Sequence, residues 1–130
     1  EKCILPAIKS GAIVVCDRFT DSTIVYQGGK NSSLINLINE LSDLVVGIEP
    51  DLTLIIDVDP EKSLNRGLKR VSKENRFEMF GLEFQKNAKL KYKTLAKENN
   101  RCRLIDGNDS KQITHKYIWN IVSNQLKLNS

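Results

Sequence analysis

The sequence predicts an α/β fold in which a parallel sheet is flanked by helices. Two short apolar runs, rich in β-branched residues, occupy residues 13–16 and 52–58, and a third short strand is expected at residues 103–106. Such runs are typical of strands that are buried on both faces of a parallel sheet. Longer segments with apolar residues at helical spacing separate them, so each connection is expected to be a right-handed helical crossover.

Composition narrows the class of protein. The 130 residues suit one domain or part of one, with 40% hydrophobic and 28% charged residues. The net charge of +4 suits phosphate-bearing ligands. Basic residues are spread along the chain and aromatic residues are few, which disfavours a nucleic-acid-binding module. No apolar span is long enough for a membrane, no Cys/His spacing predicts a metal site, and three distant cysteines predict a reducing, cytoplasmic location.

The first half of the chain is expected to hold three helices and one strand. The first helix covers residues 1–10 and ends at Gly11, and the strand 13–16 precedes a short helix over residues 20–26. Ser32 and Ser33 are candidate caps for a third helix that ends at Gly47. Its helical stripe is expected to pack into the core and consists of Leu34, Leu37, Ile38, Leu41, Leu44 and Val45.

The second half is expected to alternate strands and helices. After the strand 52–58, Asp59, Pro60 and Glu61 are typical of a helix start, and this helix runs to about residue 71. Residues 76–99 form a long helical region that Gly81 kinks or divides. The strand 103–106 turns at Gly107, and Ser110 caps a last helix whose inward positions are Ile113, Tyr117, Ile121 and Val122.

A polar segment follows the first predicted strand and is the best candidate site. Asp17 and Arg18 would lie at the carboxyl end of that strand, where ligands bind in open α/β sheets. A guanidinium can bond two phosphate oxygens at once. The alternative, a surface ion pair of little energetic value, remains open from the residue types alone. Side chains that could complete a polar pocket are Ser22, Thr23, Tyr26 and Gln27.

This segment resembles thymidylate kinase. The matching stretches are DRFTDSTIVYQGG at 17–29, PDLTLIIDVDPEKSLNR at 50–66 and the weaker NRFE at 75–78. The resemblance covers nearly the whole chain but about the last two-thirds of such an enzyme. A P-loop requires the motif Gly-x-x-x-x-Gly-Lys-Ser/Thr, and Gly29 and Lys30 are the only candidates for its Gly-Lys pair. The motif is not met, because Ile24 stands in place of the first glycine and Asn31 in place of the serine or threonine. We therefore expect a P-loop nucleoside-monophosphate-kinase-like domain over 1–130 that is incomplete at the N-terminus.

The resemblance implies transfer of the γ-phosphoryl group of ATP to dTMP, giving dTDP, with Mg²⁺ carried by ATP. It implies that Arg18 holds the dTMP phosphate, that Asp17 orients Arg18 or the magnesium-linked water, and that a lid spans about 66–76. The family is usually a homodimer, and the 130 residues alone are expected to be inactive. Alternatives are another P-loop nucleoside or nucleotide kinase, or a non-catalytic remnant that binds phosphate or nucleic acid. The remaining residues implied are Phe19, Ser22, Thr23, Tyr26 and Gln27 for dTMP, Arg66, Arg70 and Arg76 for phosphoryl transfer, and Asp106 and Gly107 beside adenine.

Overall fold

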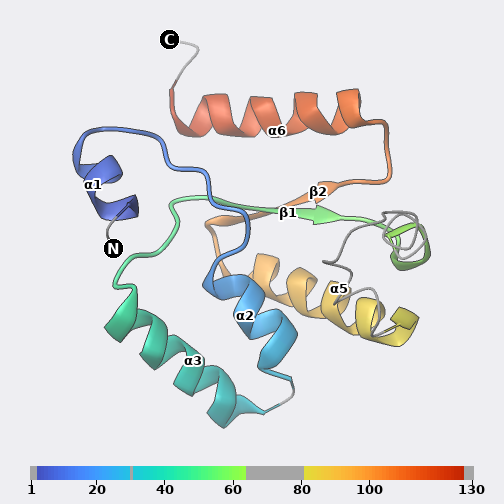
Figure 1. The fold of residues 1–130 in the computed structure, drawn as a ribbon. Helices are drawn as coiled ribbons and strands as arrows, with labels where there is room; N and C mark the ends of the chain where they lie inside the picture. The colour runs from blue at the N-terminus through green and yellow to red at the C-terminus, as the bar shows by residue number, and fades with distance from the viewer. Residues whose placement is uncertain (1–2, 30, 64–80, 128–130) are drawn as a thin grey trace. The chain divides into compact units, whose positions relative to one another are not determined.

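A computed structural model describes residues 3–29, 31–63 and 81–127. The chain divides into two compact units, one ending at Glu49 and the other beginning at Pro50. The first unit holds α1 (Ile4–Lys9), α2 (Thr20–Gln27) and α3 (Ser32–Val45). The second holds β1 (Thr53–Asp57), α5 (Gly81–Glu98), β2 (Cys102–Asp106) and α6 (Lys111–Gln125) (Figure 1).

The second unit is built on a parallel pair of strands. β1 and β2 pair in register from Thr53 opposite Cys102 to Asp57 opposite Asp106. Ile55 and Ile105 are buried, and α5 and α6 lie on opposite sides of the pair (Figure 1). The predicted α/β architecture is thereby confirmed, since two parallel strands need a long crossover and receive helices on both faces.

The first unit packs α2 against α3. The hydroxyl groups of Thr20 and Ser42 lie 2.8 Å apart in a hydrogen bond between the two helices, and Val25 is buried. At Gly28, which follows α2, an added Cβ would lie 2.6 Å from the carbonyl oxygen of Ile24 and 2.8 Å from Cγ1 of Ile35. Only glycine therefore allows this close approach of the chain to α3.

The predicted strand at residues 13–16 is wrong. The structure gives these residues an irregular backbone, with Val15 92% exposed and Ile13 63% exposed. An apolar, β-branched run becomes a strand only where a neighbouring strand takes up its backbone hydrogen bonds. β1 and β2 are the strands of the described residues, and they pair with each other. Asp17 and Arg18 consequently follow a loop.

The N-cap of the third helix lies one residue before its predicted caps. The Asn31 side chain accepts hydrogen bonds from the backbone N–H groups of Ser33 and Leu34, so Asn31 is the N-cap. The expectation that its helical stripe packs into the core is wrong for most members of the stripe. The half-buried apolar residues of α3 are Ile38, which belongs to the stripe, and Ile35, which does not. The exposed members are Leu34, Leu37, Leu41, Leu44 and Val45, at 37% to 83% exposure.

The predicted cap of the last helix, α6, is confirmed, but two of its four predicted inward residues are exposed. The Ser110 side chain accepts from the Ile113 N–H at 3.3 Å. Ile113 and Tyr117 are 46% and 59% exposed, whereas Ser123 is fully buried. The Ser123 hydroxyl donates to the Trp119 carbonyl oxygen at 2.5 Å, so a small residue that satisfies its own hydroxyl takes the inward place.

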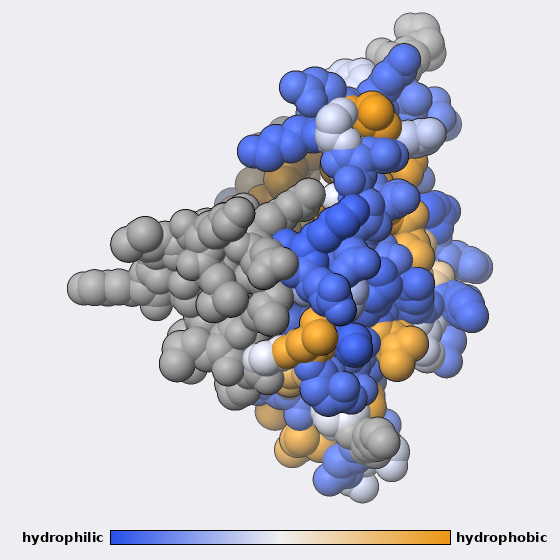
Figure 2. Space-filling model, turned by 90° about the vertical axis from the view of Figure 1, so that its right-hand side faces the viewer, coloured by the Kyte–Doolittle hydropathy of each residue, from blue (hydrophilic) through white to orange (hydrophobic). Residues whose placement is uncertain are grey.

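Residues 64–80 fall outside the described part of the chain. Residues 60–63 begin the predicted helix, and its end at residue 71 and the proposed lid at 66–76 lie outside the described residues. Gly81 opens α5 with a φ of 80°. In the described ranges, no helix combines the length and apolar character needed to cross a bilayer. The described atoms on the face drawn in Figure 2 are mostly hydrophilic, with apolar side chains in separate groups.

Candidate active site

The segment from Cys16 to Gln27 brings several predicted dTMP residues together. Arg18 has a φ of 67°, a left-handed conformation that is uncommon for a residue other than glycine. The Cys16 thiol donates to the Arg18 carbonyl oxygen at 3.3 Å. The guanidinium carbon of Arg18 lies 5.3 Å from the centre of the Tyr26 ring, within cation–π range. The backbone and the side-chain tip of Arg18 are therefore both held by residues of this segment.

The start of α2 sets the positions of the other side chains. Phe19 is the N-cap in extended conformation, and its carbonyl oxygen accepts from the Ser22 N–H at 2.9 Å. Ser22 and Tyr26 are four residues apart, as are Thr23 and Gln27, so all four lie on one face of α2. The chain thus presents hydroxyl, phenol and amide groups on one helix face that begins beside Arg18.

Asp21 is a buried carboxylate that the sequence alone did not single out. It is 4% exposed and lies in the first turn of α2. A negative charge is favoured there because the first backbone N–H groups of a helix carry partial positive charge. Asp17, by contrast, is exposed in the loop before the helix. The carboxylate closest to the core of this segment is therefore Asp21.

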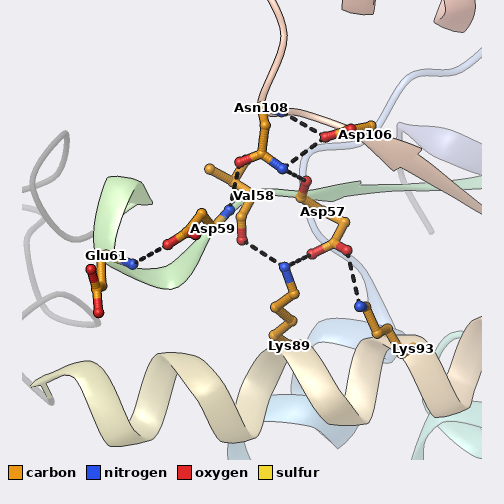
Figure 3. Close-up of polar contacts among 8 residues, drawn as sticks. All are labelled: Asp57, Val58, Asp59, Glu61, Lys89, Lys93, Asp106 and Asn108. Atoms are coloured by element: carbon orange, nitrogen blue, oxygen red, sulfur yellow. Dashed lines mark hydrogen bonds and ion pairs between the residues drawn. The ribbon is translucent and has the colours of Figure 1, made fainter.

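In the second unit, the ends of β1 and β2 are joined by Asn108 (Figure 3). Its Nδ2 donates to Oδ1 of Asp106 at 2.8 Å and to the Asp57 carbonyl oxygen at 3.5 Å. Its Oδ1 accepts from the Asp59 N–H at 2.8 Å, and its own backbone N–H donates to Oδ1 of Asp106 at 2.9 Å. One amide side chain thus contacts both strand ends and the residue that caps the next helix.

Asp57 is paired with two lysines of α5 (Figure 3). Its carboxylate oxygens lie 2.7 Å from Nζ of Lys89 and 3.4 Å from Nζ of Lys93. The Asp57 side chain is 17% exposed, and Lys89 also donates to the Val58 carbonyl oxygen at 3.4 Å. Because this carboxylate is largely desolvated, its two cationic partners matter more than an exposed ion pair would.

Gly107 fits tightly between the strand ends. Its backbone N–H donates to the Asp57 carbonyl oxygen at 2.9 Å. An added Cβ would lie 2.5 Å from Cγ2 of Ile56 and 2.7 Å from Cγ2 of Val58, closer than any packed pair of carbons allows. The loop after β2 can approach β1 this closely only with glycine at this position.

The carboxyl group of Asp106 is held in its charged form. Hydrogen bonds from the backbone and then the side chain of Asn108 lower its pKa below the ordinary value, because they stabilise the carboxylate. The group is exposed, and burial raises its pKa by less than either of these hydrogen bonds lowers it. The predicted loop at Asp106 and Gly107 is therefore an ordered turn that ends in a fixed negative charge.

The predicted helix start at Pro60 is confirmed. Oδ1 of Asp59 accepts from the Glu61 N–H at 2.9 Å, and the Asp59 carbonyl oxygen accepts from the Ser63 N–H at 2.8 Å. Asp59 thus caps the helix that leads toward the predicted lid arginines. Arg66, Arg70 and Arg76 lie outside the described residues.

Comparison with known proteins decides the family. The family model for thymidylate kinase matches residues 1–118, which is most of the chain. The chain belongs to the thymidylate kinase family. This confirms the resemblance drawn from residues 17–29 and 50–66.

Curated relatives support the same family. The chain is 50% identical to the thymidylate kinase of Dinoroseobacter shibae over 109 residues, which are 83% of this chain and 53% of that protein. It is 46% identical to the thymidylate kinase of a Jannaschia species over 128 residues, 97% of this chain and 61% of that protein. The Ruegeria pomeroyi thymidylate kinase is 47% identical over 109 residues, 83% of this chain and 52% of that protein. The chain therefore spans between half and about three-fifths of the length of these relatives.

Sequence reasoning missed Asp57, Lys89 and Asn108 as structural partners in and around the loop after β2. A signal was present, because both strands end in Ile-Asp, at 56–57 and 105–106. Two parallel strands with the same ending, aligned in register, place their aspartates side by side. Such a pair of carboxylates needs donors, and Asn108 and the lysines of α5 supply them.

Proposed function

We propose that this chain is part of an ATP-dependent thymidylate kinase that converts dTMP to dTDP, and that its first unit binds the acceptor. The observation that carries the proposal is the Arg18 guanidinium, held 5.3 Å from the Tyr26 ring at the start of a helix face with Ser22, Thr23 and Gln27. A planar guanidinium held in this way suits a phosphate monoester, and the hydroxyl and amide groups suit a nucleoside.

The described residues have separate roles in this proposal. Arg18 binds the phosphate of dTMP, and Asp17 orients Arg18 or water around the metal. Thr23 and Gln27 hydrogen-bond the thymine edge, and Phe19, Ser22 and Tyr26 shape the nucleoside pocket. A polar edge contact of this sort discriminates between bases, because a wrong base leaves buried groups without partners.

The donor side rests on the second unit and the lid. Asp106 and Gly107 border the adenine of ATP, and Arg66, Arg70 and Arg76 neutralise charge on the transferred phosphoryl group. Mg²⁺ bound together with ATP would offset part of the negative charge on the transferred phosphoryl group. Among the described residues, no three His, Cys, Asp or Glu side chains are grouped as metal ligands, and phosphate oxygens and water suit this ion.

The setting of the enzyme is also part of the proposal. We infer a homodimeric enzyme of the cytoplasm. None of the three cysteines, all within the described residues, forms a disulfide, which agrees with a reducing compartment. No Gly-x-x-x-x-Gly-Lys-Ser/Thr motif occurs in the 130 residues, so this stretch alone is expected to transfer no phosphoryl group.

The test uses a complete enzyme that carries this chain. In a chimera, the chain replaces the matching segment of the Jannaschia thymidylate kinase, and phosphorylation of dTMP by ATP is measured. The parent chimera should be active. R18A should lower kcat/KM for dTMP by roughly 100-fold or more, because a charge-assisted bidentate contact is lost. R103A is the matched control, since Arg103 is an exposed arginine whose guanidinium donates to the Asn100 and Cys102 carbonyl oxygens.

The outcomes separate clearly. A folded chimera without dTMP kinase activity, or an R18A variant that keeps the kcat/KM of the parent, would refute the proposal. Selectivity is tested by comparing dTMP with uridine and adenosine monophosphates. Q27A should narrow the preference for dTMP, because Gln27 is assigned to the base and not to the phosphate.

A further inference from the structure

We propose that Asn108 is a positioning residue for the ATP side of the site, because its side chain fixes the loop after β2 against the end of β1. The inference rests on the proposed function, which assigns Asp106 and Gly107 to the adenine of ATP. Asn108 itself need not touch the nucleotide. Its role is to set the direction of the Asp106 carboxylate and the position of the backbone beside it.

The side chain of Asn108 uses its donor and its acceptor atom on different segments (Figure 3). Nδ2 donates to Oδ1 of Asp106 at 2.8 Å and to the Asp57 carbonyl oxygen at 3.5 Å. Oδ1 accepts from the Asp59 N–H at 2.8 Å. Asp57, at the end of β1, and Asp59, just after it, lie about fifty residues from Asn108 in the sequence, whereas Asp106 lies two residues away on β2. An amide supplies both a donor and an acceptor from one side chain, which an ionised carboxylate or a lysine cannot do.

The strand pair does not by itself fix these groups. The ladder ends where the Gly107 N–H donates to the Asp57 carbonyl oxygen at 2.9 Å. Beyond that point, the Asp59 N–H and the Asp106 carboxylate are held by Asn108. Loss of the side chain would therefore leave the sheet in place and remove the side-chain hydrogen bonds that join the turn after β2 to the end of β1.

The same contacts act on charge. The hydrogen bonds from Asn108 are the largest causes that lower the pKa of Asp106. A carboxylate held in one direction at the edge of the nucleotide loop contributes a fixed field there. Replacing the Asn108 side chain keeps the backbone N–H bond to the Asp106 carboxylate but removes the bond from Nδ2, and it leaves the Asp59 N–H without this acceptor. The Asp106 carboxylate is then held by one donor of Asn108 in place of two, so the ATP side should be affected before the dTMP side.

The experiment measures KM for each substrate in the active chimera. N108A should raise KM for ATP roughly tenfold, the effect expected for a lost hydrogen-bonding side chain, and leave KM for dTMP within about twofold. The matched control is N99A. Asn99 is also half-buried, and its Nδ2 donates to the Leu95 carbonyl oxygen at 3.0 Å, but it precedes β2 at the opposite end. N99A should keep the KM for ATP of the parent.

A second variant keeps the test decisive if N108A folds poorly. N108D retains an oxygen that accepts from the Asp59 N–H but places a second carboxylate against Asp106. Its KM for ATP should rise at least as far as that of N108A, because the donor to Asp106 is lost and two carboxylates repel each other, while KM for dTMP stays within about twofold. A residue needed only for folding would raise both KM values together. Other charged groups near this position are Asp57, Asp59, Lys62 and Lys89.

Failure of this inference differs from failure of the proposed function. An active chimera in which N108A and N108D keep the KM for ATP of the parent would overturn the positioning role and leave the dTMP assignment intact. Equal rises in KM for ATP and for dTMP would also overturn it, since they would reveal general loosening of the fold. Inactivity of the folded parent chimera would instead count against the proposed function.

Discussion

Replacing Gly107 by alanine should destabilise the protein through a steric clash at the strand ends. The new Cβ would lie 2.5 Å from Cγ2 of Ile56 and 2.7 Å from Cγ2 of Val58. Both neighbours are β-branched, so their χ1 angles are stiff and the methyl groups cannot turn away cheaply. Gly107 is not among the glycines with positive φ, so the clash and not backbone strain dominates.

The expected magnitude follows from the size of the overlap. Overpacking a filled site by one methyl group typically costs about 1–3 kcal/mol, and two contacts this short place G107A near 2 kcal/mol. For a domain of 150 to 250 residues, that cost lowers Tm by roughly 4–8 °C. Urea unfolding of the chimera, followed by circular dichroism, measures the free energy of unfolding directly.

A double-mutant cycle identifies the clash as the cause. I56A removes the methyl group at 2.5 Å, and Ile56 is 44% exposed, so this truncation alone should cost less than truncation of a core residue. The G107A/I56A pair should recover about 1 kcal/mol relative to the sum of the single changes. The reasoning is refuted if G107A costs less than about 0.5 kcal/mol or if the two effects simply add.

Two further predictions concern the charges around the same strand ends. K89M should lower the free energy of unfolding by about 1–2 kcal/mol, because it removes the lysine whose Nζ lies 2.7 Å from the Asp57 carboxylate and leaves Lys93 at 3.4 Å. An unchanged midpoint of urea unfolding would contradict this prediction. Folding lowers the pKa of Asp106 below its ordinary value of 3.8. At pH values above 3.8 the ionised carboxylate therefore stabilises the folded state. This stabilisation is lost as the pH falls through the lowered pKa of the folded state. D106N should therefore reduce the loss of stability between about pH 5 and pH 3 in urea unfolding; an acid response equal to that of the parent would show that Asp106 contributes nothing to it.

Sequence reasoning was most successful where local signals and long-range pairing agree. The runs at 52–58 and 103–106 became β1 and β2, and Ser110 and Asp59 cap helices as predicted. In each case the residues carry the signal themselves, as a buried apolar run between turn residues or as a side chain that accepts from the next turn. The family followed from motifs at 17–29 and 50–66, of which the second includes β1 and the Asp59 cap.

The errors have a common physical origin. Residues 13–16 have strand propensity but receive no partner strand in the described structure, and most members of the predicted stripe of α3 are exposed. Strand formation and choice of buried face depend on what a segment contacts, and that information is not local. The cap of α3 is a different kind of error, because its signal is local but ambiguous. Asn31 and the two serines that follow it are equally plausible N-caps by residue type, and the structure uses Asn31.

The conformation of Arg18 shows why a family motif and a local rule can disagree. Steric rules place a left-handed φ at glycine or asparagine, and the sequence has an arginine there with a φ of 67°. Such a conformation costs on the order of 1–2 kcal/mol, so the surroundings must hold it. The Cys16 thiol on its carbonyl oxygen and the Tyr26 ring under its guanidinium are the contacts that do so. A residue that accepts strain while its charged tip is stacked is oriented before any ligand arrives, and this favours a binding role for Arg18 over that of a surface arginine.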